Sequence, residues 1–166
     1  MKIGLIDCIY NKIDARDMAS KILESKIPDL EIIRFSAPDS LKVPVAAKKM
    51  FSEGADVILV FLTVGAEEKE ALDLVHEKII DVEVYFGKLV FFCILFDDEW
   101  RREEQLGELS EKKLAASVEL ISRIVHAPEM ARQMASAERK EVSPALGEAL
   151  NFMNQPTEEE DIHSLF

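Results

Sequence analysis

Four short apolar runs alternate along the chain with longer stretches in which apolar residues recur at a helical spacing. Runs of this length, bounded by turn residues, are typical of buried strands. The predicted strands are Lys2–Ile6, Leu30–Phe35, Val57–Leu62 and Leu89–Leu95. The predicted helices are Arg16–Ser25, Pro44–Glu53, Glu67–Phe86 and Leu109–Val125. The alternation indicates an α/β fold, a three-layer α/β/α sandwich with a mainly parallel four-stranded sheet.

The junction after the third predicted strand is the most informative segment. The strand Val57–Leu62 ends in Thr63-Val64-Gly65 and runs directly into a long predicted helix. A glycine turn between the carboxyl end of a strand and a helix is where α/β proteins commonly bind small ligands. We therefore expect Thr63 and Gly65 to contribute to a binding site.

Titratable side chains gather near the start of that helix. Lys69, Asp73 and His76 are spaced so that they share one helix face, and Glu77 follows. An imidazole with a reference pKa of about 6.5 is suited to proton transfer at neutral pH. The commoner alternative is a surface histidine paired with Asp73. Three further carboxylates suit a helix N-terminus on dipole grounds alone. They are Glu67, Glu68 and Glu70.

Two other loops leave predicted strands at the same edge of the sheet. The first contains Cys8, Tyr10 and Asn11. In the second, Pro38 and Pro44 restrict the backbone and bias their neighbours toward extended conformations. A stiff loop of this kind is suited to present backbone groups to a flat polar heterocycle. The residues alone favour a plain connector between strand and helix.

Composition and charge exclude several classes of function. The chain has 166 residues and a net charge of −12, without the basic face that nucleic-acid binding needs. Its apolar runs are shorter than the roughly 18 residues of a membrane span. An acidic residue at position 7 comes too early for a signal peptide, which predicts a cytoplasmic protein. The two cysteines, Cys8 and Cys93, show neither a disulfide pattern nor metal-ligand spacing.

Well-known catalytic fingerprints do not occur in the sequence. It has no P-loop motif, no G-x-G-x-x-G after the first strand and no G-x-S-x-G elbow. A zinc-protease HExxH motif starting at His76 would need a second histidine where Ile80 stands. We therefore expect a ligand site without a cofactor fingerprint.

A series of short motifs, in order and at consistent spacing, resembles the archaeal-type riboflavin synthases, which are related to the lumazine synthases. The motifs span roughly residues 1–135. They are Gly4-Leu5-Ile6-Asp7, Asp17-Met18-Ala19-Ser20, Ile32-Ile33-Arg34, Pro38 through Pro44-Val45-Ala46-Ala47-Lys48-Lys49, Gly54-Ala55-Asp56-Val57, Gly65-x-x-x-Lys69, His76-Glu77 and Asp98-Glu99.

The resemblance implies a lumazine-synthase-like domain at 1–135 that assembles as a homopentamer with sites between subunits. It implies a transferase that converts two 6,7-dimethyl-8-ribityllumazine molecules into riboflavin and a ribitylamino-pyrimidinedione. No organic cofactor is expected, and a divalent cation such as Mg²⁺ is left open. We expect His76, Lys69 and Glu77 to be catalytic. The expected substrate-binding residues are Cys8, Tyr10, Asn11, Pro38, Asp39, Leu41, Lys42, Val43, Thr63 and Gly65.

Two alternatives stay open beside a riboflavin synthase. A lumazine synthase would show a Gly-Glu-Thr-x-His signature where this chain has Gly65-Ala66-Glu67-Glu68-Lys69. A non-catalytic paralogue that binds flavin or lumazine is favoured by departures from the family pattern, such as Asp39 in place of a glycine and Lys42 in place of an acidic residue.

The chain changes character after about residue 127. Residues Glu129–Lys140 have the composition of a helix, and Pro144, Gly147 and Pro156 interrupt the stretch after it. For 136–166, which the resemblance does not cover, we expect a mobile solvated tail. The alternative is a segment that docks on a neighbouring subunit through Phe152, Leu165 and Phe166.

Overall fold

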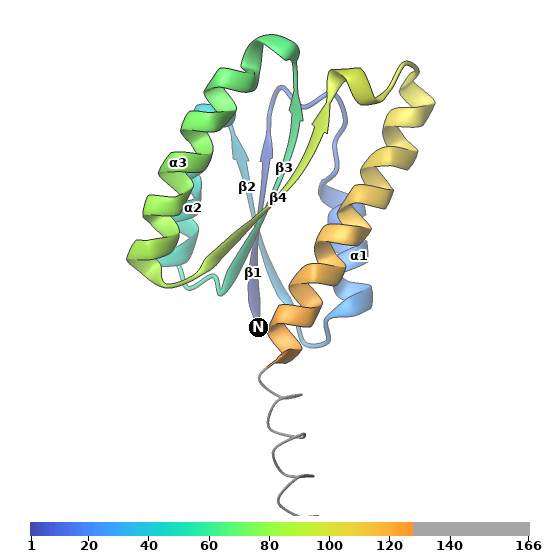
Figure 1. Cartoon of the computed structure of the whole chain (residues 1–166). Helices are drawn as coiled ribbons and strands as arrows, with labels where there is room; N and C mark the ends of the chain where they lie inside the picture. The colour runs from blue at the N-terminus through green and yellow to red at the C-terminus, as the bar shows by residue number, and fades with distance from the viewer. Residues whose placement is uncertain (128–166) are drawn as a thin grey trace, which may run out of the picture. The chain divides into compact units, whose positions relative to one another are not determined.

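Four parallel strands lie at the centre of the fold (Figure 1). The computed structural model describes residues 1–127, and Met1–Val125 form a compact unit. Its elements are β1 (Lys2–Cys8), α1 (Arg16–Lys26), β2 (Glu31–Ala37), α2 (Val43–Ser52), β3 (Val57–Val64), α3 (Lys69–Phe86) and β4 (Leu89–Phe96). Residues 103–127 are also helical.

The strand order is β2-β1-β3-β4, with every neighbouring pair parallel. The inner strand β3 is buried along almost its whole length, as its unbroken apolar sequence predicts for a strand covered on both faces. The register pairs Asp7 of β1 with Ser36 of β2 and with Phe61 of β3. The parallel order brings the carboxyl ends of all four strands, and the loops that leave them, to one edge.

Alternate residues of the inner strands pack into two separate hydrophobic cores. Ile6, Val60 and Leu62 face the core that is completed by α2 and α3. Leu5 and Phe61 face the opposite core, which contains residues of α1 and of the helix at 103–127. Figure 1 shows α2 and α3 on one side of the sheet and the other two helices on the opposite side. The predicted α/β sandwich with a parallel four-stranded sheet is therefore confirmed.

Two helix starts differ by two residues or more from the sequence-based prediction, whereas α2 begins one residue before its predicted start. α3 begins at Lys69 and not at Glu67, because Ala66–Glu68 form a separate 3₁₀ turn after Gly65. The last helix begins at residue 103, six residues before the predicted start at Leu109. Leu106 is fully buried in the second core, so burial of an additional turn extends this helix toward its N-terminus.

The predictions for Glu129–Lys140 and for the segment 136–166, including Phe152, Leu165 and Phe166, lie outside the described residues. Within residues 1–127, no helix is both long enough and apolar enough to span a membrane.

Gly4 of β1 is required by close packing against Ile58 of β3 and Met50 of α2. A Cβ atom at this position would lie 2.9 Å from Cγ1 of Ile58 and 3.1 Å from Sδ of Met50. We predict that Gly4→Ala lowers the free energy of unfolding by about 1–3 kcal/mol, because the rigid side chain of Ile58 cannot withdraw. Urea denaturation measures the change.

Gly107 provides the matched control. It lies in the helix at 103–127, and a Cβ there would meet no atom within 4 Å. Gly107→Ala should therefore raise the free energy of unfolding by about 0.5–1 kcal/mol. Equal effects of the two substitutions would contradict the packing argument.

Candidate functional site

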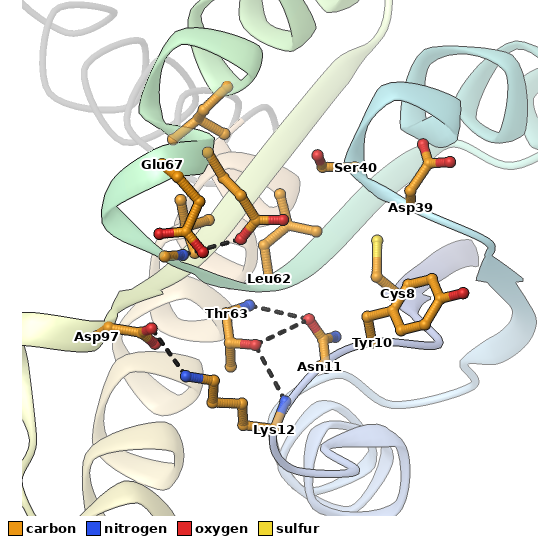
Figure 2. A pocket seen from close by; sticks show the side chains of 14 residues that line it. Cys8, Tyr10, Asn11, Lys12, Asp39, Ser40, Leu62, Thr63, Glu67 and Asp97 are labelled. Atoms are coloured by element: carbon orange, nitrogen blue, oxygen red, sulfur yellow. Dashed lines mark hydrogen bonds and ion pairs between the residues drawn. The ribbon is translucent and has the colours of Figure 1, made fainter.

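A hollow opens at the carboxyl ends of β1 and β3, where the loops that follow all four strands meet (Figure 2). Its empty space, including the open mouth, is about 600 Å³. The lining residues are Cys8, Tyr10, Asn11, Lys12, Asp39, Ser40, Leu62, Thr63, Val64, Gly65, Glu67, Glu68, Leu72 and Asp97. The hollow lies where parallel α/β sheets bind ligands.

The side chain of Asn11 fixes the loop after β1 against the end of β3. Its Nδ2 donates a hydrogen bond to the carbonyl of Phe61 at 3.0 Å, and its Oδ1 accepts one from the Thr63 N–H at 2.9 Å. The backbone N–H of Lys12 donates to Oγ1 of Thr63 at 3.0 Å. An amide is suited to this position because it can donate and accept at the same time. Three hydrogen bonds therefore hold one wall of the hollow.

The ammonium group of Lys12 interacts with side chains of the protein itself. Its Nζ lies 2.8 Å from Oδ2 of Asp97, at the end of β4, and 5.3 Å from the ring centre of Trp100. Figure 2 shows this ion pair at the lower margin of the hollow. The contact ties the first loop to β4, as Asn11 ties it to β3.

Carboxylates outnumber cations along the lining. Asp39, Glu67, Glu68 and Asp97 contribute acidic groups, whereas Lys12 is the one lysine or arginine that lines the hollow in the described part of the chain. A ligand that brings negative charge would meet repulsion here, whereas hydroxyl and N–H groups would find acceptors.

Two of these carboxylates fold back onto Gly65. Oε2 of Glu68 accepts a hydrogen bond from the Gly65 N–H at 2.9 Å, which caps the turn that leads into α3. A Cβ on Gly65 would lie only 2.9 Å from Oε1 of Glu67. The glycine therefore makes room for a carboxylate of the chain itself.

The thiol of Cys8 lies in the wall and is buried. Burial raises the pKa of Cys8 to about 12, and the charge of the neighbouring Asp7 acts in the same direction. The group is therefore a neutral thiol near pH 7, and it is not suited to act as a nucleophile.

Asp7, the residue before Cys8, joins the end of β1 to neighbouring elements. Its Oδ1 accepts a hydrogen bond from Ser36 Oγ at 2.8 Å, and its Oδ2 lies 3.5 Å from Nε of Arg16. The same guanidinium also bonds Asp14, which lowers the pKa of that carboxyl to about 2. These pairs fix the end of β1 and the start of α1 relative to each other.

Six of the predicted substrate-binding residues are brought together in the hollow, and four are not. Those that line it are Cys8, Tyr10, Asn11, Asp39, Thr63 and Gly65. Those that do not line it are Pro38, Leu41, Lys42 and Val43. Val43 is fully buried at the start of α2, and Leu41 is about half exposed. Asp39 accepts the N–H of Lys42 at 3.2 Å, so this loop closes on itself as a capped turn.

Lys69 lies beside the hollow, in a smaller depression between the start of α3 and the end of β4. Its Nζ is 5.4 Å from the ring centre of Phe96 and 3.9 Å from Oδ2 of Asp98. The two depressions share Val64 and Asp97. The lysine therefore borders the site without lining it.

His76 and Glu77 lie farther along α3 and do not line the hollow of their own chain. Seven residues of helix separate His76 from Lys69, which corresponds to about 10 Å. The His76 ring is half-buried and packs edge-on against Phe92, with 4.5 Å between ring centres. Glu77 is exposed and pairs with Lys78 at 3.0 Å. Within residues 1–127, no hydrogen bond joins His76 to Asp73.

The sequence-based prediction missed several lining residues. Glu67 and Glu68 were assigned to the helix dipole alone, and Lys12, Ser40 and Asp97 were given no role as site residues. Their positions in the sequence could have indicated these residues, because each of them lies within a few residues of a strand's carboxyl end. Their convergence depends on the strand order, which local sequence does not specify.

No family model matches the chain, but several archaeal riboflavin synthases are similar to it. It is 25% identical to the riboflavin synthase of Aeropyrum pernix over 125 residues, 74% of this chain and 81% of that protein. It is 25% identical to the riboflavin synthase of Archaeoglobus fulgidus over 153 residues, 90% and 99% of the two chains.

A third relative, the riboflavin synthase of Methanothermobacter marburgensis, is 22% identical over 151 residues, which cover 89% of this chain and 98% of that protein. The comparisons therefore support a relationship at low identity between this chain and archaeal riboflavin synthases.

Proposed function

We propose that the protein is a riboflavin synthase, a transferase that converts two molecules of 6,7-dimethyl-8-ribityllumazine into riboflavin and 5-amino-6-ribitylamino-pyrimidinedione. One lumazine donates a four-carbon unit to the other. The two substrates together contain the same atoms as the two products, so no oxidant or reductant is consumed. The observation that carries the proposal is a hollow rich in hydrogen-bond acceptors at the carboxyl edge of the sheet, in a chain similar to riboflavin synthases over most of its length.

The chemistry of the lining suits this substrate. A ribityl chain carries hydroxyl donors, and Asp39, Glu67 and Glu68 offer carboxylate acceptors. Tyr10 is 81% exposed at the rim, where its ring is free to stack on a flat heterocycle. The reaction mainly requires two rings to be held in a fixed relative orientation, which a wall fixed by Asn11 favours.

The alternative lumazine synthase reaction fits the hollow less well. Its second substrate is a four-carbon phosphate, and a phosphate would enter a space lined by four carboxylates and by one lysine already paired with Asp97. Charge therefore favours the riboflavin synthase reaction. The alternative of a binding protein without turnover is favoured by the position of His76 and Lys69 outside the hollow of a single chain.

An assembly of several copies would explain how His76 could belong to a site although it does not line the hollow of its own chain. Its side chain shares one face of α3 with Ile80 and Val84, which are spaced at successive four-residue intervals. Ile80 is 57% exposed and Val84 is 79% exposed, so this face presents apolar area to solvent. A contact between copies through this face would cover that area and place His76 at the junction. We propose a homopentamer, in line with the resemblance, with sites completed by neighbouring subunits.

In this proposal the residues have distinct roles. His76 moves the proton that the 7-methyl group of one lumazine must lose, with Glu77 orienting the imidazole or binding a ribityl hydroxyl. Lys69 stabilises negative charge as it develops. Asn11, Thr63 and Gly65 hold the substrate wall in place. No organic cofactor is required.

The first prediction from the proposed function concerns turnover. Purified full-length protein incubated with 6,7-dimethyl-8-ribityllumazine should produce riboflavin, followed by its fluorescence, at one riboflavin for two lumazines consumed. A parallel sample with EDTA tests for a divalent cation. Binding without turnover would select the binding-protein alternative, and activity only with the pyrimidine and the four-carbon phosphate would select lumazine synthase.

The second prediction concerns His76. His76→Phe retains an aromatic ring against Phe92 but removes the titratable nitrogens, so the fold should be kept. We expect kcat to fall by about 10²-fold or more, as for loss of general acid–base catalysis, with an unchanged melting temperature. Full turnover by the variant would show that His76 does not transfer the proton.

The third prediction concerns Asn11. Asn11→Ala leaves the Phe61 carbonyl and the Thr63 N–H without their partner, so the first loop should move away from β3. We expect kcat/KM to fall by about 10- to 100-fold through misplacement of the wall. Ser52→Ala, which removes one hydrogen bond on the surface of α2, is the matched control and should leave kcat/KM unchanged.

A further inference from the structure

The start of a helix that follows a strand is normally an attractive place for a phosphate group. Free backbone N–H groups point outward there, and the helix dipole favours negative charge. In this protein the equivalent place, between Gly65 and the start of α3, borders the hollow. Side chains of the protein that occupy this place therefore limit which ligands can enter the hollow.

Carboxylates of the chain already occupy this position. Glu68 takes the Gly65 N–H through a hydrogen bond of 2.9 Å, so this donor is not available to a ligand. The Glu67 carboxylate lies against the open side of Gly65, where a Cβ would approach its Oε1 to 2.9 Å. Figure 2 shows the Glu67 side chain close to the turn that follows β3.

The surroundings of these two carboxylates do not neutralise them. Asp39 and Asp97 add acidic groups from the loops after β2 and β4. Lys12, the one lysine or arginine of the lining among residues 1–127, bonds Asp97 and packs over Trp100. Lys69 is directed toward Phe96 and Asp98, in the neighbouring depression.

We propose that Glu67 and Glu68 determine ligand specificity by rejecting phosphorylated ligands, so that the site accepts ribityl heterocycles with a free terminal hydroxyl and excludes their 5′-phosphates. The inference rests on the proposed function and names the substrate class of the same site. A phosphate dianion would meet two like charges at close range and find the Gly65 amide occupied. A terminal hydroxyl instead donates a hydrogen bond to a carboxylate.

Isosteric substitution distinguishes a role of the two glutamates in ligand specificity from a purely structural role in the turn. In Glu68→Gln the side-chain amide oxygen still accepts the Gly65 N–H, so the turn remains capped while the charge is lost. The double variant E67Q/E68Q therefore separates charge from capping. The control E70Q/D73N makes the same change in net charge at two exposed positions of α3 that do not line the hollow.

The experiment compares full-length wild type, E67Q/E68Q and E70Q/D73N. Fluorescence titration gives the dissociation constants of riboflavin and riboflavin 5′-phosphate, and calorimetry tests inorganic phosphate. Wild type and control should bind riboflavin at least about tenfold more tightly than its phosphate, as expected for like charges at short range. E67Q/E68Q should reduce that preference by at least about tenfold and gain measurable affinity for phosphate.

Equal binding of both flavins by wild type, or an unchanged preference in E67Q/E68Q, would overturn the inference. If wild type binds neither flavin nor the lumazine, the proposed function fails, and the phosphate titration decides the inference separately. A gain of phosphate binding in E67Q/E68Q alone then supports charge exclusion, and no gain overturns it. Circular dichroism verifies folding, and the single variant E67Q, which leaves the Glu68 cap untouched, replaces the double variant if that one is unfolded.

Discussion

The attachment of the β1–α1 loop to the end of β3 is the interaction on which the site depends. One amide, that of Asn11, bonds both a carbonyl and an N–H of β3 across 50 residues of sequence. Without it, two backbone groups at the end of a central strand would need water as partners, and Cys8 and Tyr10 would no longer share a wall with Thr63. The ion pair between Lys12 and Asp97 extends the same attachment to β4. The hollow is thus held by contacts between strand ends and not by any single element.

A second constraint is the concentration of negative charge at this edge. Four carboxylates around one hollow repel each other, which costs stability unless solvent screens them or hydrogen bonds stabilise them. Both conditions are met here. Glu68 is bonded to the Gly65 amide and Asp39 to the Lys42 amide, so capping of local turns offsets part of the repulsion. The remaining acidity disfavours anionic ligands and offers acceptors to ligands that donate hydrogen bonds, as the ribityl chain of the proposed substrate would.

The position of His76 links the proposed chemistry to assembly. In one chain its ring packs against Phe92 and does not line the hollow, whose lining on α3 includes Leu72, four residues before His76. On the same face of α3 lie apolar residues that one chain leaves in contact with solvent. A proton-transfer role for His76 and a functional single chain are therefore difficult to reconcile, whereas a role at a junction between copies requires no rearrangement of the fold. The catalytic proposal and the oligomeric proposal consequently depend on each other.

Local sequence was enough to predict the four strands, the helices between them, the parallel sheet and the edge at which the hollow opens, because these follow from apolar periodicity and from strand–helix alternation. It also selected Asn11, Thr63 and Gly65, which line the hollow. Tertiary packing was needed to establish that Lys12 and Asp97 meet, that Glu67 folds over Gly65, and that Val43 is directed into the core. These facts depend on strand order and on side-chain directions beyond the strand ends, where residues far apart in sequence become neighbours and no local pattern records the pairing.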